Sequence, residues 1–275
     1  MAEEGSSEEY MEIVSNAEFL DGSVIFHLVR DSVGFVLYMH QQIPSVLQDM
    51  TLEFDTLCTE FKELELDLTQ SEVKKVSVRR KHISRMREIK REIKRVEKLM
   101  NTVSSLQTAL QLMVREIPNV QKVMLVLGGS PIRPRYVYEL FFSHGEVVSS
   151  GSGDFSKSKA AEMLSRKAIR ALISKDAGSS SYPGPTKLFL LVKAPSSFNL
   201  PQHFLPKRDF RYSKKIVPFR LRFKCRTRVG EMDSLHHASQ TRNSTCLKDA
   251  ISNDFIWFQC RHVIKGLALE GREEE

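Results

Sequence analysis

The apolar run at residues 120–127 is the sequence feature that most restricts the fold. It reads Val-Gln-Lys-Val-Met-Leu-Val-Leu and is rich in β-branched residues. Such a run predicts a buried central strand, because neither of its faces is consistently polar. Residues 128–131, Gly-Gly-Ser-Pro, break the run. Residues 136–142 then predict a second strand, antiparallel to the first.

Apolar side chains at three- and four-residue spacing predict helices over about 24–43, 80–117 and 160–175. Residues 52–68 fit a helix as well as a strand, and the pattern leaves both open. Further strands are predicted at 187–192, 217–224 and 254–259. This order predicts an α+β fold, in which helices cover one face of a mostly antiparallel sheet.

The chain predicts one domain over residues 19–269, between a mobile acidic tail at 1–18 and a disordered acidic tail at 270–275. No apolar run is long enough to cross a membrane, and the acidic beginning of the chain lacks the apolar segment of a secretory signal. The four cysteines lie far apart without paired spacing, which indicates reduced thiols. We therefore expect a protein of the cytosol, the nucleus or both.

Positive charge is concentrated in two stretches, although the net charge of the whole chain is only +7. Residues 74–98 hold twelve Lys or Arg against three Glu, and residues 200–228 hold ten against one Asp. Such stretches suit an anionic partner, either nucleic acid or an acidic protein surface. The first stretch has no aromatic residue, so stacking on bases is not expected there. The alternative is a solvated helix face.

Motifs for chemistry are weak throughout the chain. Gly128 and Gly129 follow a strand, but prolines and another strand come next, so a tight turn explains them better than a phosphate-binding loop. The pairs His236–His237 and Cys260–His262 are too scattered for structural zinc. No serine has the surroundings of a nucleophile elbow, and no carboxylate pair stands out. We expect a non-catalytic protein without a cofactor or metal.

Residues 203–215 mix aromatic and basic side chains, a composition typical of binding hot spots. The alternative is a loop that lays its aromatic rings on its own core. The side chains concerned are Phe204, Phe210, Tyr212, Lys207, Arg208 and Arg211.

Several segments resemble the Comet family, the adaptors that bind the spindle-checkpoint protein Mad-two. Residues 123–130 with 138–140 are similar to the central hairpin of that family, and residues 254–259 with Lys265-Gly266 to its last strand. Residues 38–44 resemble the end of its first helix, and residues 204–207 a loop before its penultimate strand. The resemblance runs in family order from about residue 24 to 267. It implies a HORMA-like fold, with a sheet backed by three helices and a C-terminal segment wrapped as a closed safety belt.

The resemblance also implies a function. Comet proteins recognise the closed conformer of a HORMA protein and present it to a hexameric AAA+ ATPase of the Pch-two type, which opens it. This silences the spindle checkpoint and, in meiosis, turns over HORMA proteins on chromosome axes, where it affects synaptonemal-complex dynamics. The implied location is the nucleus and its chromosomes, and also the cytoplasm. Direct nucleic-acid binding through residues 74–98 is the alternative function.

Site residues follow from the same resemblance. The chain has Ile169 where the family has an aromatic residue and Met39 where it has a glutamine, and a β-branched anchor buries less area than a phenyl ring. Pro206 and Lys207 would face the ATPase. The residues that would face the HORMA partner are Met39, His40, Gln41, Arg166, Ile169, Arg170 and Ile173.

Overall fold

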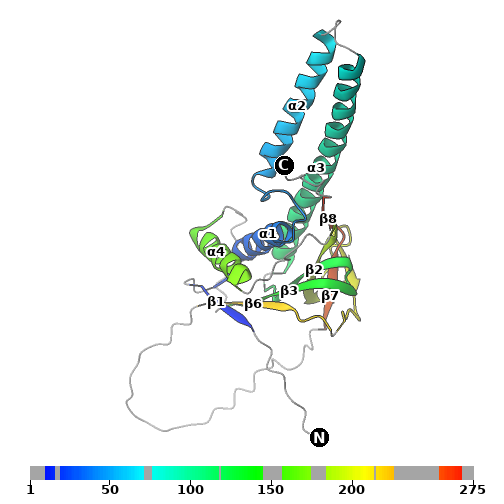
Figure 1. Ribbon diagram of the computed structural model, residues 1–275. Coiled ribbons are helices and arrows are strands. Elements are labelled where there is room, and N and C mark those ends of the chain that lie inside the picture. The colour runs from blue at the N-terminus through cyan, green and yellow to red at the C-terminus, as the bar shows by residue number, and fades with distance from the viewer. Residues whose placement is uncertain are drawn as a thin grey trace, which may run out of the picture.

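The computed structural model describes residues 10–15, 19–70, 76–117, 119–144, 157–174, 184–213, 215–225 and 254–267. Within these ranges the chain forms four helices and one eight-stranded sheet (Figure 1). The helices are α1 (Gly22–Met39), α2 (Met50–Gln70), α3 (Val76–Glu116) and α4 (Lys159–Ser174). The strands are β1 (Met11–Val14), β2 (Lys122–Ser130), β3 (Arg133–Ser143), β4 (Lys187–Pro195), β5 (Phe204–Lys207), β6 (Phe219–Lys224), β7 (Phe255–Cys260) and β8 (Ile264–Lys265).

Strand order in the sheet is β1-β6-β3-β2-β4-β7-β5, and β8 pairs with β4. Strand β2 lies between β3 and β4 and is antiparallel to both, as the apolar run and the turn after it predicted. Two pairings, β1 with β6 and β3 with β6, are parallel. The predicted α+β class with a mostly antiparallel sheet is confirmed.

The sheet is covered on both faces. On one face, side chains of β2, β3 and β4 join those of α1, α3 and α4 in the main core. On the other face, Phe210, Tyr212 and Ile216 from the connection between β5 and β6 cover a smaller cluster. That cluster consists of Met124, Val126, Val137, Phe189 and Leu191. The connection has to cross the sheet, because β5 lies at one edge and β6 on the far side of β3.

Helix α2 resolves the ambiguous segment and adds a fourth helix to the three that were predicted. Its partly buried apolar residues are spaced alternately three and four apart, the repeat of a two-helix seam, and α2 contacts α3 along its length. The hairpin of α2 and α3 extends away from the sheet (Figure 1). No described helix is both long and apolar enough to cross a membrane. The seam residues of α2 are Phe54, Leu57, Phe61, Leu64 and Leu68.

Strand β1 corrects the prediction of a mobile tail over residues 1–18, because residues 11–14 pair in parallel with β6. The guanidinium carbon of Arg222 lies 3.8 Å from the centre of the Tyr10 ring, a cation–π contact. The Lys224 ammonium forms an ion pair with Glu12. Residues 1–9 and 268–275 lie outside the described ranges, so the tails predicted there stay predictions.

Glu139 is a buried carboxylate in the middle of β3, with only 4% of its side chain exposed. Lys122 Nζ and Arg220 Nε each lie 3.0 Å from one of its oxygens, and the Tyr212 hydroxyl donates to it at 3.3 Å. These contacts link β2, β3, β6 and the crossing connection. The carboxylate is paired on each side, which is the condition for burying a charge.

We expect Glu139→Gln to lower the free energy of unfolding by about 3 kcal/mol, because Lys122 and Arg220, whose side chains are only 20% exposed, lose their counter-charge. Urea denaturation would measure the change. Glu12→Gln is the matched control on the same sheet, since its ion pair is exposed, and we expect little change there. Equal effects of the two substitutions would contradict a structural role for Glu139.

Candidate functional site

Helix α4 carries most of the residues assigned to partner binding. It begins after Ser158, whose hydroxyl accepts a hydrogen bond from the Ala161 amide at 3.2 Å and so caps a free backbone donor. One side of the helix is buried against α1. Its buried residues are Ala161, Leu164, Ser165, Ala168, Ala171 and Leu172.

The opposite side of α4 is open, and we call it the α4 ridge: Met163, Arg166, Ile169, Arg170 and Ile173. Ile173 is 60% exposed and Met163 45% exposed, while Ile169 is half-buried. Both arginines are exposed. Spacings of three, four and seven residues bring these side chains onto one helical face. Large exposed aliphatic groups beside guanidinium groups are the composition of a protein-docking surface.

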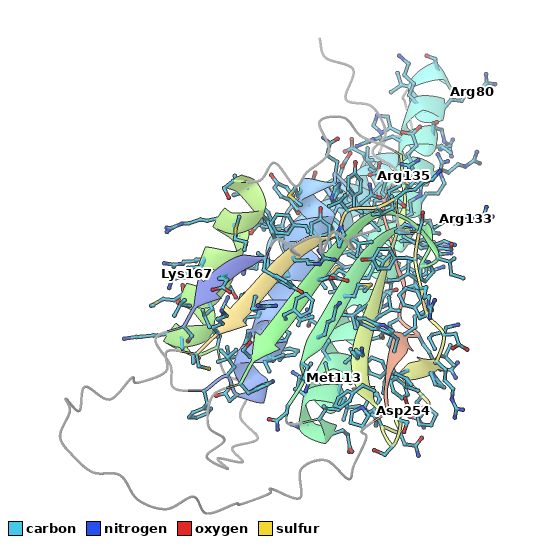
Figure 2. The ribbon with its side chains drawn as sticks, turned by 90° about the horizontal axis from the view of Figure 1, so that it is seen from below. Arg80, Met113, Arg133, Arg135, Lys167 and Asp254 are labelled. Atoms are coloured by element: carbon cyan, nitrogen blue, oxygen red, sulfur yellow. The ribbon has the colours of Figure 1, made fainter. Side chains whose placement is uncertain are left out.

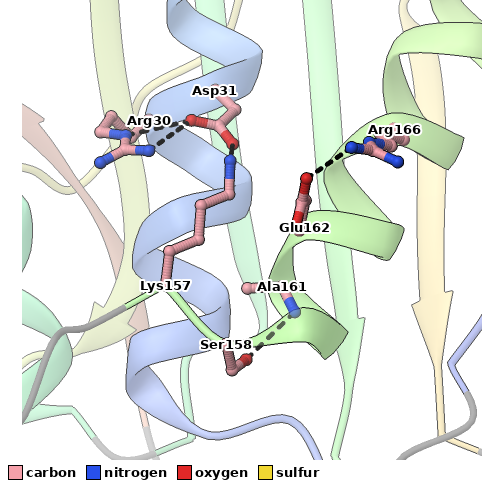
Figure 3. A network of polar contacts seen from close by, with 7 residues as sticks. All are labelled: Arg30, Asp31, Lys157, Ser158, Ala161, Glu162 and Arg166. Atoms are coloured by element: carbon pink, nitrogen blue, oxygen red, sulfur yellow. Dashed lines mark hydrogen bonds and ion pairs between the residues drawn. The ribbon is translucent and has the colours of Figure 1, made fainter.

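Arg166 and Lys167, two cations of α4, have different partners. Arg166 forms an exposed ion pair with Glu162, one turn earlier (Figure 3). Such a pair contributes little free energy, so Arg166 is able to exchange it for a carboxylate on a partner. Lys167 instead donates to the backbone oxygen of Val14 at 2.9 Å, which joins α4 to strand β1. Figure 2 shows Lys167 beside that edge of the sheet.

Asp31 of α1 fixes the beginning of α4 (Figure 3). Its Oδ1 accepts from the Arg30 guanidinium at 2.9 Å, and its Oδ2 accepts from Lys157 Nζ at 2.7 Å. Burial alone would raise the pKa of Asp31, but the hydrogen bonds from Lys157 and Arg30 outweigh it and hold the pKa below its usual 3.8. The α4 ridge therefore rests on a helix that is anchored to α1 just before its first turn.

The end of α1 supplies the other three assigned residues, and the structure places them unequally. Met39 and Gln41 are half-buried, and Gln41 has a left-handed backbone with φ of 54°. His40 is fully buried, with its Nε2 2.5 Å from the Tyr138 hydroxyl, and burial lowers its pKa to about 4. Its imidazole also packs against the Tyr136 ring. The side chain of His40 is thus a neutral core group and does not reach the surface, contrary to its assignment as a contact residue.

Gln42 is a buried residue that sequence reasoning missed. Its amide nitrogen donates to the His40 backbone oxygen at 2.8 Å, and its amide oxygen accepts from the Thr186 amide at 2.7 Å. The Leu267 amide donates to the Gln42 backbone oxygen at 2.9 Å. Gln42 therefore joins α1, the beginning of β4 and the segment after β8. Apart from His40, its partners lie more than a hundred residues away along the chain, so no local pattern predicts them.

Pro206 and Lys207 end strand β5 and are both exposed. They lie opposite Phe258 and Trp257 of β7. Strand β5 is an edge strand, where a proline without a backbone donor is tolerated and discourages further pairing. Phe204 at its beginning is buried and holds the strand to the core.

The aromatic residues after β5 pack on the protein's own core, which was the alternative prediction for residues 203–215. The Phe210 ring packs edge-on to Trp257 at 6.0 Å, and Tyr212 covers the outer cluster of the sheet. They belong to the protein's own core, whereas Lys207, Arg208 and Arg211 remain exposed.

Cys260 and His262, which were considered for metal binding, lie near β5 together with His203. His203 Nδ1 lies 2.9 Å from His262 Nε2, so one imidazole donates to the other and joins β5 to the end of β7. Burial lowers the pKa of His262, and the charge of His203 adds to this effect. Burial raises the pKa of Cys260 to about 11, which keeps its thiol protonated at neutral pH.

The remaining motifs behave as structural elements. A Cβ on Gly128 would lie 2.9 Å from the backbone oxygen of Arg133, so close approach in the β2–β3 hairpin explains that glycine. In the described part of the chain, no group of three or more His, Cys, Asp or Glu side chains is arranged to hold a metal. His236 and His237 lie outside the described residues.

The α4 ridge and the end of β5 lie at opposite edges of the sheet. Helix α4 contacts β1, the first strand in the sheet order, and β5 is the last. Comparison with protein-family models and with curated protein sequences finds no match for this chain. The assignment of the two surfaces therefore depends on the resemblance of the sequence segments and on their geometry.

We expect Asp31→Asn to lower the free energy of unfolding by about 1 kcal/mol at pH 7, because the hydrogen bonds from Arg30 and Lys157 lose an ionised acceptor. The folded-state pKa of Asp31 is depressed, so its contribution is present above the usual value of 3.8 and is lost as the pH falls through the folded value. The gap between variant and wild type should therefore close below about pH 4.

Urea denaturation across this pH range measures the effect. Asp55→Asn, on the exposed side of α2, is the control and should leave the profile unchanged. A gap of constant size at all pH values would show that the ionised form of Asp31 is not what stabilises the fold.

Proposed function

We propose that this protein is a non-catalytic adaptor of the Comet type, which docks a closed HORMA protein on the α4 ridge and presents it to a hexameric AAA+ ATPase of the Pch-two type. The observation that carries the proposal is the exposure of Ile173, 60%, on the same face of α4 as the exposed Arg166 and Arg170. A rigid helix that displays such a side chain fits the surface of another folded protein.

Docking suits this chain better than catalysis. Burial lowers the pKa of His40 and raises the pKa of Tyr138 and Cys260, so each stays uncharged near pH 7, and all three lie inside the core. A general acid, base or nucleophile has to reach a substrate. In the proposed adaptor His40 acts as a core residue that supports the end of α1, while Met39 and Gln41 form the rim of the docking surface.

The end of β5 suits a second partner. Pro206 limits the conformations of this turn, and Lys207 projects a positive charge that an acidic patch on the ATPase would attract. Because this turn and the α4 ridge lie at opposite edges of the sheet, both partners are able to bind at once. Simultaneous binding is what an adaptor between a substrate and a remodelling enzyme requires.

The path of the chain supports a closed HORMA-like arrangement in the adaptor itself. The connection between β5 and β6 crosses the outer face of the sheet, and β7 and β8 return to pair with β4. The Leu267–Gln42 hydrogen bond then ties the C-terminal segment to α1. The process proposed for this adaptor is silencing of the spindle checkpoint, turnover of meiotic axis proteins, or both, in the nucleus, on chromosomes and in the cytoplasm.

We expect Ile173→Asp to weaken the complex with a purified closed HORMA protein by at least about tenfold, because a charge replaces an apolar anchor. Ile132→Asp is the matched control: Ile132 is also an exposed aliphatic residue, 65% exposed, but lies in the turn between β2 and β3. Both variants should fold, since neither side chain is buried. Calorimetry measures the affinities, and equal loss in both variants, or no wild-type complex at roughly ten micromolar, would contradict the docking proposal.

Lys207→Glu should leave HORMA binding unchanged and reduce recruitment of the ATPase, because it reverses the charge that faces the acidic patch. A pull-down with the hexameric ATPase, in the presence of nucleotide, measures recruitment. Lys215→Glu makes the same charge change at an exposed position after the crossing aromatic residues and serves as the control. Loss of HORMA binding in the Lys207 variant would mean that the two surfaces are not separate.

A further inference from the structure

Helix α3 carries a row of exposed cations along the projecting hairpin. We call it the α3 stripe: Arg80, Arg87, Lys90, Arg91, Lys94 and Lys98, all exposed. Successive members are three, four or seven residues apart, apart from the adjacent Lys90 and Arg91, so the row stays on one face of the helix. From first to last it covers about 27 Å at 1.5 Å per residue. Figure 2 shows Arg80 at the far end of the hairpin, away from the sheet.

The carboxylates near the stripe are mostly used elsewhere. Glu60 of α2 accepts a hydrogen bond from Arg85 at 3.0 Å, and Glu88 and Glu92 also act on Arg85. Arg85 lies outside the stripe, on the side that faces α2. Glu97, next to Lys98, is also exposed. The stripe therefore keeps a strong excess of positive charge.

The surface beside the stripe is hollowed between its cationic side chains. Residues Ser84, Arg87, Lys90, Arg91 and Lys94 surround a hollow of about 410 Å³. A second hollow, of about 480 Å³, continues from Lys94 and Lys98 along the helix to His262. Lys94 lines both hollows, and Glu97 also lines the second.

We propose that the α3 stripe binds the phosphodiester backbone of duplex nucleic acid. A protein partner would need apolar or aromatic anchors, as the α4 ridge provides, and the stripe has none. Single-stranded nucleic acid would need aromatic rings for base stacking, which are also missing from the stripe. What remains is a straight row of flexible cations, which suits sequence-independent contacts to phosphates.

The second basic stretch of the sequence does not compete for this role. Arg220 is paired with Glu139, and Lys224 is paired with Glu12, so part of its charge is neutralised within the sheet. The hairpin, in contrast, extends away from the sheet and gives a rod-shaped duplex room to approach (Figure 1). A length of about 27 Å corresponds to about eight base pairs of a duplex.

The test is a salt titration of the full-length protein with a fluorescent 20-base-pair duplex, followed by anisotropy. Wild-type affinity should fall up to about a thousandfold between about 50 and 200 mM salt. The triple variant Arg87→Glu, Lys90→Glu, Lys94→Glu should lose at least tenfold affinity at the lower salt and show a shallower salt slope, by about 3. The control makes the same change in net charge with Arg133→Glu, Arg208→Glu and Lys215→Glu, all exposed and outside α3, and should retain most of the affinity.

Three results would overturn the proposal. The first is the absence of duplex binding by the wild type at the lower salt. The second is an equal loss in both triple variants, which would indicate a net-charge effect without a defined site. The third is tighter binding of poly-glutamate than of duplex at the same salt, which would identify an acidic protein surface as the ligand. Because neither triple variant alters the α4 ridge, HORMA binding in the same samples reports separately on the proposed adaptor function.

Discussion

Burial of strand β2 on both of its faces is the constraint on which the rest of the structure depends. Its alternate side chains enter two different clusters, one under the helices and one under the connection from β5 to β6. A single helical layer would leave the second cluster in water, so the chain has to cross the sheet after β5. That crossing places β6 beside β3, and β6 in turn gives β1 a partner. The edge on which α4 rests is therefore a consequence of how the centre is covered.

Local pattern was enough to predict most elements. The apolar run at 120–127 predicts a strand by itself. The apolar residues of α3 and α4 recur at three- and four-residue spacing over several turns, which predicts each helix without knowledge of its partners. The segment 52–68 was ambiguous because Leu64, Leu66 and Leu68 alternate like a strand, while Phe54, Leu57, Phe61, Leu64 and Leu68 repeat like a helix. The contact with α3 decides between them, and it leaves Leu66 exposed. Strand β1 was missed because its partner β6 lies about two hundred residues later and the residues before it are polar.

The site was predictable where a residue's role depends on its own helix, and less so where it depends on distant groups. Arg166, Arg170 and Ile173 are exposed, as the helical spacing suggested. His40 looked like a surface residue at a helix end, but Tyr136 and Tyr138 of β3 enclose it. The buried positions of Glu139 and Gln42 were not predictable from local pattern either, since the hydrogen-bond partners of each come from several strands or loops. Long-range polar pairing is the part of a fold that a one-dimensional pattern does not contain.

The glycine at position 266 has a consequence for how this protein is able to vary. Any Cβ there would overlap the amide group of Gln42, which already bonds to the beginning of β4. A side chain at 266 would thus have to displace either that amide or the C-terminal segment itself. The amide is the far end of a flexible side chain, but moving it would break its hydrogen bonds to Thr186 and His40. A substitution at this single position would therefore disturb the junction at which Gln42 joins the end of α1, the beginning of β4 and the segment after β8.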